Sequence, residues 1–124
     1  MILKIQFAEP DILGFEVKGK VSEAAFVNMK QELIPKMEAP GKIKLYVEIT
    51  RYDGTDWEVV WDSLKFAFAK GKSYFSNVSK IALVTDKVWM RFLASAEYAL
   101  IPSIKEKSFS MEEKEEALKW IREN

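Results

Sequence analysis

The chain contains no cysteine and no histidine. Without cysteine there is no disulfide, no thiolate nucleophile and no sulfur ligand for a metal ion. Without histidine the chain lacks both the usual general base near neutral pH and a very common metal ligand. Ser-His-Asp hydrolysis, Cys-His chemistry and HExxH zinc sites are therefore excluded. We expect a protein that is not an enzyme and needs no metal or other cofactor, and any acid–base role would fall to a lysine or to Asp53, Asp56 or Glu48.

The chain also lacks an excess of charge of either sign. Nineteen Lys+Arg balance 19 Asp+Glu, so the formal net charge is +0. Such a chain produces no overall field that would attract nucleic acid, and we expect no nucleic-acid partner. The same neutrality gives little protection against self-association, so a homodimer is among the expected partners.

Long apolar runs are missing as well. No stretch approaches the roughly 20 residues that a membrane-spanning helix needs. The first five residues lack the basic segment and long apolar core of a signal peptide. We therefore expect a cytoplasmic protein, with peripheral membrane contact as the alternative.

The pattern that is present predicts one α/β domain over residues 1–124. Hydrophobic content of 48% and charged content of 31% are typical of a globular chain. Alternating or continuous apolar residues predict strands, and apolar residues at helical spacing predict helices in the order ββαβαβαβα. We expect a mostly parallel sheet with an antiparallel N-terminal edge strand and four main helices. The strands are expected at 2–7, 12–17, 42–49, 80–84 and 105–109, and the helices after Ser22, at 57–70, at 87–100 and after Ser110.

Local signals fix several of these boundaries. The four apolar residues 81–84 predict a central strand that is buried on both faces, and Asp86 is expected to cap the helix that follows. Pro35 is expected to kink or end the first helix by Ile34 or soon after. Ser110 and Glu113 form a capping-box pattern that opens the last helix.

The candidate binding site consists of two aromatic helix faces. On helix 57–70 the apolar residues recur at helical spacing, and its polar residues are left as a narrow stripe. Such faces usually belong to a core, but this apolar arc is wider than one sheet contact can cover. A second helix, a ligand, a partner subunit or a lipid surface must cover the remainder. The candidate residues are Trp57, Trp61, Leu64 and Phe68 on this helix, and Trp89, Phe92 and Leu93 on helix 87–100.

A polar loop, residues 51–56, lies next to this candidate site. Tyr52, Asp53 and Asp56 are its residues nearest to the aromatic faces. The acidic run could suggest a hard cation, but calcium needs six or more oxygen ligands at ordered spacing, which this loop does not supply. We interpret the loop as a solvated turn with a helix cap, and not as a metal site.

Several stretches, taken in order, resemble the SpoIIAA-like family, which is related to the sulfate-transporter and anti-sigma-factor-antagonist (STAS) domains. The stretches are Gly14-Phe15-Glu16-Val17, Gly19-Lys20-Val21, Lys42 to Glu48, Trp61-Asp62, Lys80 to Asp86, Trp89, Phe109 and Glu116 to Ile121. The resemblance implies a βα superhelical fold similar to the lipid-binding CRAL-TRIO domain. It also implies an apolar ligand between mobile helices, membrane association, and no established catalytic activity. One feature departs from the antagonist pattern, because the turn at 51–56 has no phosphorylatable serine.

We therefore expect a non-catalytic binding module. Its ligand would be an apolar or lipid-like small molecule held between helices 57–70 and 87–100, with peripheral membrane association as an accompanying property. The alternative is a protein-interaction module, either a homodimer or a STAS-type regulator, that uses the same apolar face.

Overall fold

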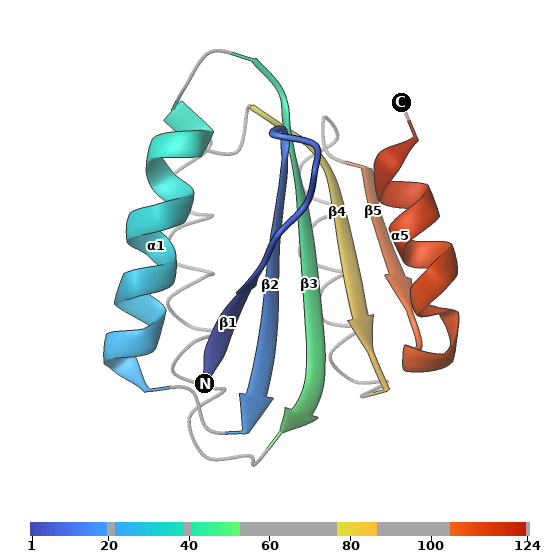
Figure 1. The fold of residues 1–124 in the computed structure, drawn as a ribbon, viewed down its shortest axis with the longest axis horizontal. Coiled ribbons are helices and arrows are strands. Elements are labelled where there is room, and N and C mark those ends of the chain that lie inside the picture. Colours follow the sequence, from blue (N-terminus) through green and yellow to red (C-terminus); the bar gives the residue numbers. More distant parts are fainter. Residues whose placement is uncertain (20–21, 39–40, 53–76, 87–104, 124) are drawn as a thin grey trace.

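A computed structural model of the chain describes residues 1–19, 22–38, 41–52, 77–86 and 105–123. These residues form a five-stranded sheet in which the spatial order of the strands follows the chain, β1-β2-β3-β4-β5 (Figure 1). The strands are β1 (Ile2–Ile5), β2 (Ile12–Gly19), β3 (Ile43–Tyr52), β4 (Val78–Thr85) and β5 (Lys105–Phe109). The described helices are α1 (Glu23–Glu38), the short 3₁₀ helix η1 (Met111–Glu113) and α5 (Lys114–Arg122).

The sheet is mixed, as the sequence predicts. β1 pairs antiparallel with β2, and each following strand pairs parallel with its predecessor. Parallel neighbours need a long crossover, and α1 provides the one between β2 and β3. The predicted single-domain α/β class and antiparallel edge strand are confirmed. The predicted helices 57–70 and 87–100 lie outside the described residues.

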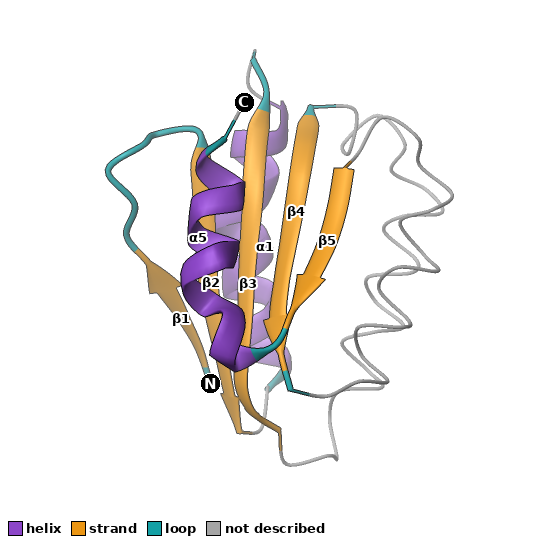
Figure 2. Cartoon of the chain, turned by 90° about the vertical axis from the view of Figure 1, so that its right-hand side faces the viewer, coloured by secondary structure: helices purple, strands orange, loops and turns teal. Residues whose placement is uncertain are grey.

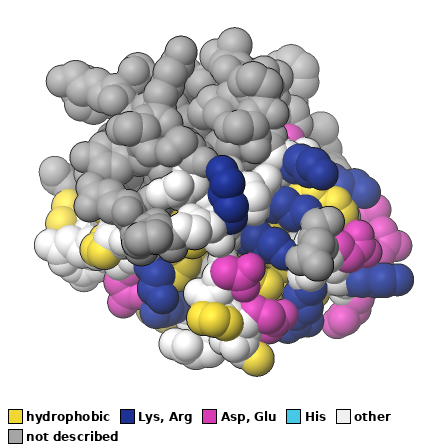
Figure 3. Space-filling model, turned by 90° about the horizontal axis from the view of Figure 1, so that it is seen from above, with side chains coloured by type: hydrophobic (Ala, Val, Ile, Leu, Met, Phe, Trp, Pro, Cys, Tyr) yellow, Lys and Arg dark blue, Asp and Glu magenta, His cyan; other side chains and the backbone are white. Residues whose placement is uncertain are grey.

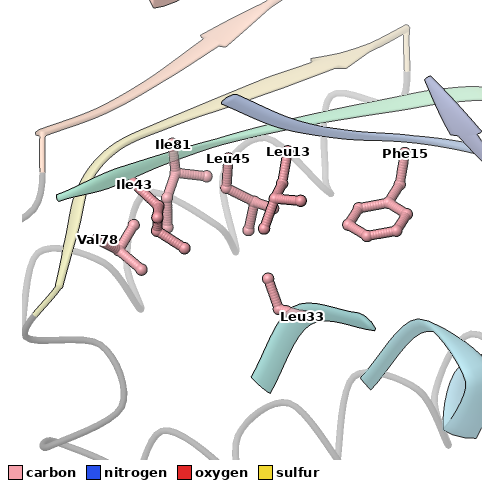
Figure 4. Packing of buried hydrophobic residues seen from close by; sticks show 7 residues of the cluster. All are labelled: Leu13, Phe15, Leu33, Ile43, Leu45, Val78 and Ile81. Atoms are coloured by element: carbon pink, nitrogen blue, oxygen red, sulfur yellow. The ribbon is translucent and has the colours of Figure 1, made fainter. Parts of the chain in front are cut away.

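The two described α-helices lie on opposite faces of the sheet, with α5 in front of it and α1 behind it in Figure 2. Side chains alternate between the faces along each strand, so each strand contributes to two cores. The cluster on the α1 face is entirely aliphatic and aromatic, and Leu33 of α1 points toward it (Figure 4). Its buried members are Leu13, Phe15, Leu33, Ile43, Leu45, Val78 and Ile81.

The α5 face carries a second cluster, in which Ala117 and Ile121 of the helix are completely buried. Its strand residues are Ile12, Tyr46, Ala82, Val84 and Phe109. Unlike the α1 face, this face also holds buried charged residues. Lys44 and Glu48 on β3 and Lys80 on β4 are each at most 9% exposed. A buried charge is costly unless it is paired, so these residues must have partners.

The ends of β1, β2 and β4 differ by up to two residues from the predicted ranges, and three further predictions need correction. β3 continues through Arg51 and Tyr52, which the sequence placed in the loop, because β2 extends to Gly19 and offers them pairing partners. α1 runs past Pro35 to Glu38. The carbonyl of Gln31, whose hydrogen bond Pro35 cannot supply, belongs to an exposed residue that water can reach.

The third correction concerns the position of β4. It is buried on both faces, as predicted, yet it is the fourth strand of five and the sheet centre is β3. β5 covers the edge of β4, and this explains why an apolar run there resembles a central strand. β5 itself is the edge strand that its charged residues predict.

Helix caps agree with the sequence in two places and add one unexpected contact. The Ser22 Oγ accepts a hydrogen bond from the Ala25 N–H at 3.1 Å, as a helix N-cap should. The Ser110 N–H donates to Glu113 Oε1 at 2.9 Å, which is half of the predicted capping box. The Oδ1 of Asp86 accepts from the Met111 N–H at 3.0 Å. Asp86 therefore binds the start of η1, a contact across 25 residues that local pattern could not indicate.

Candidate functional site

The residues that the sequence singles out fall in the parts of the chain that are not described. Trp57, Trp61, Leu64, Phe68, Trp89, Phe92, Leu93, Asp53 and Asp56 all lie outside the described residues. Tyr52 is placed by its backbone as the last residue of β3, opposite Gly19 of β2. The predicted aromatic site therefore stays a prediction.

Within the described residues, a cavity of about 330 Å³ lies between α5 and the N-terminal edge of the sheet. We call it the α5 cavity. Its floor is formed by β2 and β3, one wall by residues of β1 and the turn that follows, and the other wall by α5. Lys114, Leu118 and Arg122 are spaced at i, i+4 and i+8, so they line one face of the helix. The lining residues are Ile5, Gln6, Phe7, Glu16, Tyr46, Glu48, Lys114, Leu118 and Arg122.

The floor contains a buried carboxylate with two partners. The side chain of Glu48 is 3% exposed, and its Oε1 lies 3.1 Å from Lys114 Nζ. Its Oε2 accepts a hydrogen bond from the Tyr46 hydroxyl at 3.3 Å. Tyr46 and Glu48 share one face of β3 because they are two residues apart. Lys114 is the first residue of α5, and its side chain reaches the Glu48 carboxylate from the helix.

Tyr46 is held in its protonated form by this environment. Burial raises the pKa of Tyr46 above its ordinary range, and the charge and hydrogen bond of Glu48 raise it further. The ring also makes an edge-on contact with Phe7, with the two ring centroids 5.6 Å apart. The hydroxyl is therefore a hydrogen-bond donor and not a base.

Arg122 closes the other end of the helical wall. Its Nε lies 2.7 Å from Glu9 Oε2, in the turn between β1 and β2. Its guanidinium lies 5.5 Å from the centroid of the Phe7 ring, a cation–π distance. Because the Arg122 side chain is 49% exposed, the ion pair itself contributes little to stability. The two contacts connect α5 to the turn beside the cavity.

A second charged arrangement lies at the C-terminal end of α5. The Lys44 Nζ donates to the Glu123 carbonyl at 2.9 Å, and the Lys80 Nζ donates to the carbonyls of Trp120 and Glu123 at 3.0 and 2.7 Å. The Lys80 Nζ also lies 4.7 Å from the centroid of the Trp120 ring. Carbonyls at a helix C-terminus lack intrahelical donors and carry partial negative charge. The two lysines therefore cap α5.

The pKa of Lys80 is lowered at this position. Burial lowers the pKa of Lys80, and the nearby charge of Lys44 lowers it further. Lysine and arginine side chains lie beside acidic ones at this end of the molecule, as seen from above in Figure 3. Both lysines donate to the carbonyls at the end of this helix, so we assign them a structural role.

The sequence pattern does not predict most of this site, although it leaves Glu48 as a residue able to serve acid–base chemistry. A signal was present. Lys44, Tyr46 and Glu48 alternate with apolar residues on a strand that lies at the sheet centre. A polar face on a central strand indicates a covered polar network when a helix packs on it. The amphipathic last helix, with Lys114 at its start, is the matching partner.

The described part of the chain contains no group of three or more acidic residues that could hold a metal ion. Among its helices, none has the length and apolar character that crossing a membrane requires.

The fold and the charged cavity together define a small mixed-sheet α/β domain with a helix on either side. The comparison with protein families gives a more specific assignment, because the SpoIIAA-like family matches residues 12–122. The chain therefore belongs to the SpoIIAA-like family, which confirms the resemblance seen in the sequence.

A solved structure shows the same fold. It is the crystal structure of an uncharacterised protein of the DUF3478 family from Shewanella loihica PV-4, described as having a SpoIIAA-like fold. The TM-score is 0.68 at 22% sequence identity, over 98% of this chain and 92% of that one. No curated protein matches the sequence. At this identity the similarity establishes the fold and does not extend to activity.

Proposed function

We propose that the protein is a non-catalytic binding module that holds an apolar or lipid-like small molecule between segments 57–70 and 87–100. The observation that carries the proposal is the pairing of β3 with β4. These strands are parallel neighbours, and they end at Tyr52 and Thr85. We therefore expect the two tryptophan-bearing segments to follow the carboxyl ends of adjacent strands, where open α/β sheets commonly bind ligands.

The apolar α1 face supports the same location. Ile49 on β3 and Leu83 on β4 are buried on this face, near the carboxyl ends of their strands, yet neither belongs to the cluster around Leu33. Parallel crossovers are right-handed as a rule, and with the strand order β2-β3-β4-β5 this rule favours crossovers on the same face as α1. We expect both segments to run there. In this proposal the protein is cytoplasmic and the site opens toward a peripheral membrane surface.

The distribution of tryptophan makes the proposal testable. Trp120 is the one tryptophan on α5, and the other three are Trp57, Trp61 and Trp89. In a Trp120→Phe variant all tryptophan fluorescence comes from the two proposed segments. We expect a bromine-labelled fatty acid to quench this emission in a saturable way. A variant that keeps only Trp120 is the matched control, and its emission should not change.

Saturable quenching of Trp120 alone would place an apolar ligand on the other face of the sheet and contradict the proposal. The proposal would also be contradicted if the emission of both variants stayed unchanged and native mass spectra showed no bound apolar molecule. A Trp57→Ala/Trp61→Ala variant should lose binding to lipid vesicles. If the native protein is instead a dimer by light scattering and this variant is a monomer, the apolar face is a homodimer interface.

A further inference from the structure

We propose that the α5 cavity is a second binding site, for a small zwitterion of the chemical class of a free α-amino acid with an apolar side chain. This site lies on the face of the sheet opposite α1 and shares no residue with the tryptophan-bearing segments. The inference is independent of the proposed function. It depends on the signs of charge around the cavity, on its apolar walls and on its size.

The charges that line the cavity are separated by element. Both carboxylates, Glu16 and Glu48, come from the strands of the floor, and both cations, Lys114 and Arg122, come from α5. Glu16 and Glu48 are direct partners on neighbouring parallel strands, so their side chains project side by side. A molecule that lies between floor and helix therefore meets negative charge on one side and positive charge on the other.

The acidic floor fits an ammonium group. Within the described residues, Glu48 contacts Lys114 through Oε1 and Tyr46 through Oε2, and a carboxylate has about four acceptor positions. Glu16 is 21% exposed, and its Oε1 lies 3.5 Å from Lys18 Nζ. Both carboxylates can therefore accept further hydrogen bonds. The Tyr46 hydroxyl faces the same region, and the charges of Glu48, Glu115 and Glu16 all act on it.

The helical wall fits the carboxylate of the same molecule. The Lys114 side chain is 45% exposed, so it can turn from Glu48 to a bound carboxylate without being desolvated. Binding then exchanges one ion pair for two, because the ligand ammonium takes the place of Lys114 at Glu48. A ligand with only one charge would pair with the floor carboxylates or with the cations of α5, but not with both.

The remaining lining and the size restrict the ligand further. Ile5, Phe7 and Leu118 supply apolar and aromatic surface to both walls. About 330 Å³ lies at the lower end of the range for ligand cavities. The cavity therefore suits an amino-acid-sized molecule whose side chain packs against Phe7 and Leu118.

Three probes of similar shape test separately whether binding requires the ammonium and the carboxylate of the ligand. L-Phenylalanine carries both charges, phenethylamine carries the ammonium alone and hydrocinnamate carries the carboxylate alone. Each is titrated to roughly 10 mM into the isotope-labelled full chain, which suffices for a Kd near 1 mM. We expect L-phenylalanine to shift the amide NMR signals of Gly14, Glu16 and Tyr46. The two singly charged probes should bind at least about tenfold more weakly.

Variants then place the binding site. Glu48→Gln and Lys114→Gln should each weaken L-phenylalanine binding about tenfold, a change well beyond the error of such a titration. Lys119→Gln, an exposed change on α5 outside the cavity lining, should leave it unchanged. If a cavity variant fails to fold, the shift map of the native chain still decides, because shifts confined to other elements contradict the proposal. Equal binding of phenethylamine, equal binding of hydrocinnamate, or no shifts at all would also overturn it.

Discussion

Lys44 and Lys80 face each other on neighbouring strands, and both ammonium groups donate to the same acceptor, the Glu123 carbonyl, at 2.9 and 2.7 Å. The register places two like charges side by side, which is unfavourable by itself. The C-terminal carbonyls of α5 offset this repulsion. These hydrogen bonds connect the C-terminal end of α5 to β3 and β4.

This shared acceptor predicts non-additive substitutions. Lys44→Met leaves Lys80 on Glu123, and Lys80→Met leaves Lys44 there, while each also removes the like-charge repulsion. We expect each single change to lower the free energy of unfolding by no more than about 1 kcal/mol. The double variant should lose more than the sum, because the carbonyl then has no donor. Urea denaturation measures the cycle, and additive effects would show that the lysines act separately.

Substitutions of Glu48 and Lys114 should show a large coupling free energy. Glu48 is buried and depends on Lys114 as its cation. Lys114→Met leaves a buried carboxylate without its cation, and we expect a loss of about 1–3 kcal/mol in the free energy of unfolding. Glu48→Gln keeps an acceptor for Tyr46 and should cost less. In the Glu48→Gln background, Lys114→Met should be nearly neutral. A Lys114→Met effect that is the same in both backgrounds would argue against the pair.

The raised pKa of Tyr46 predicts a loss of stability at high pH. Unfolded tyrosine ionises near pH 10, whereas folded Tyr46 keeps its proton above that value. Between the two pKa values the unfolded chain binds fewer protons, so stability that is complete below about pH 10 is lost as the pH rises. The Tyr46→Phe variant should lack this part of the pH dependence. Tyrosinate absorbance gives an independent check, since the difference between native protein and variant should titrate above pH 10.

The lowered pKa of Lys80 predicts that stability rises with pH, in a range below that of the Tyr46 effect. The Lys80 pKa is lowered in the folded state, so the unfolded chain binds more protons below the ordinary lysine pKa of about 10.4. Stability should therefore rise with pH as the pH passes from the folded to the unfolded pKa. Denaturation curves of the Lys80→Met variant should lack this rise. The same rise in native protein and variant would show that other groups cause it.

Gly14 should tolerate no side chain. Gly14 is in β2 and pairs with Ile5 of β1. A Cβ added to Gly14 would overlap Phe7 Cε2 and lie 3.0 Å from Ile5 Cβ. We expect Gly14→Ala to cost about 1–3 kcal/mol of stability, as overpacked core sites do. A Phe7→Val change in the same chain should recover part of the loss. If Phe7→Val makes Gly14→Ala worse, the clash with Phe7 is not the cause.

The sequence predicted the sheet well because the signal for each strand is local. Alternation on β3 correctly placed Tyr46 and Glu48 on the face opposite the apolar residues. Long-range contacts were less predictable. Nothing near Asp86 indicates that it binds Met111, and nothing near Lys80 indicates a helix end as its partner. The predicted aromatic site at Trp57, Trp61 and Trp89 stays a prediction. The α5 cavity was missed because its lining comes from four separate stretches of the chain.

The distance along the chain between Lys44 and its acceptor has a consequence for biosynthesis. All described members of the α1-face cluster have been synthesised once residue 81 is available, whereas Lys44 meets Glu123 only 79 residues after its own synthesis. We expect the two faces to form in this order on the ribosome, and long-range contacts of this kind to be the slower ones. Until α5 emerges, the nascent sheet presents Lys44, Tyr46 and Glu48 on its uncovered face. These polar side chains, which lie beside the apolar Ile12, Ala82 and Val84 on the same face, would be hydrated until α5 covers them.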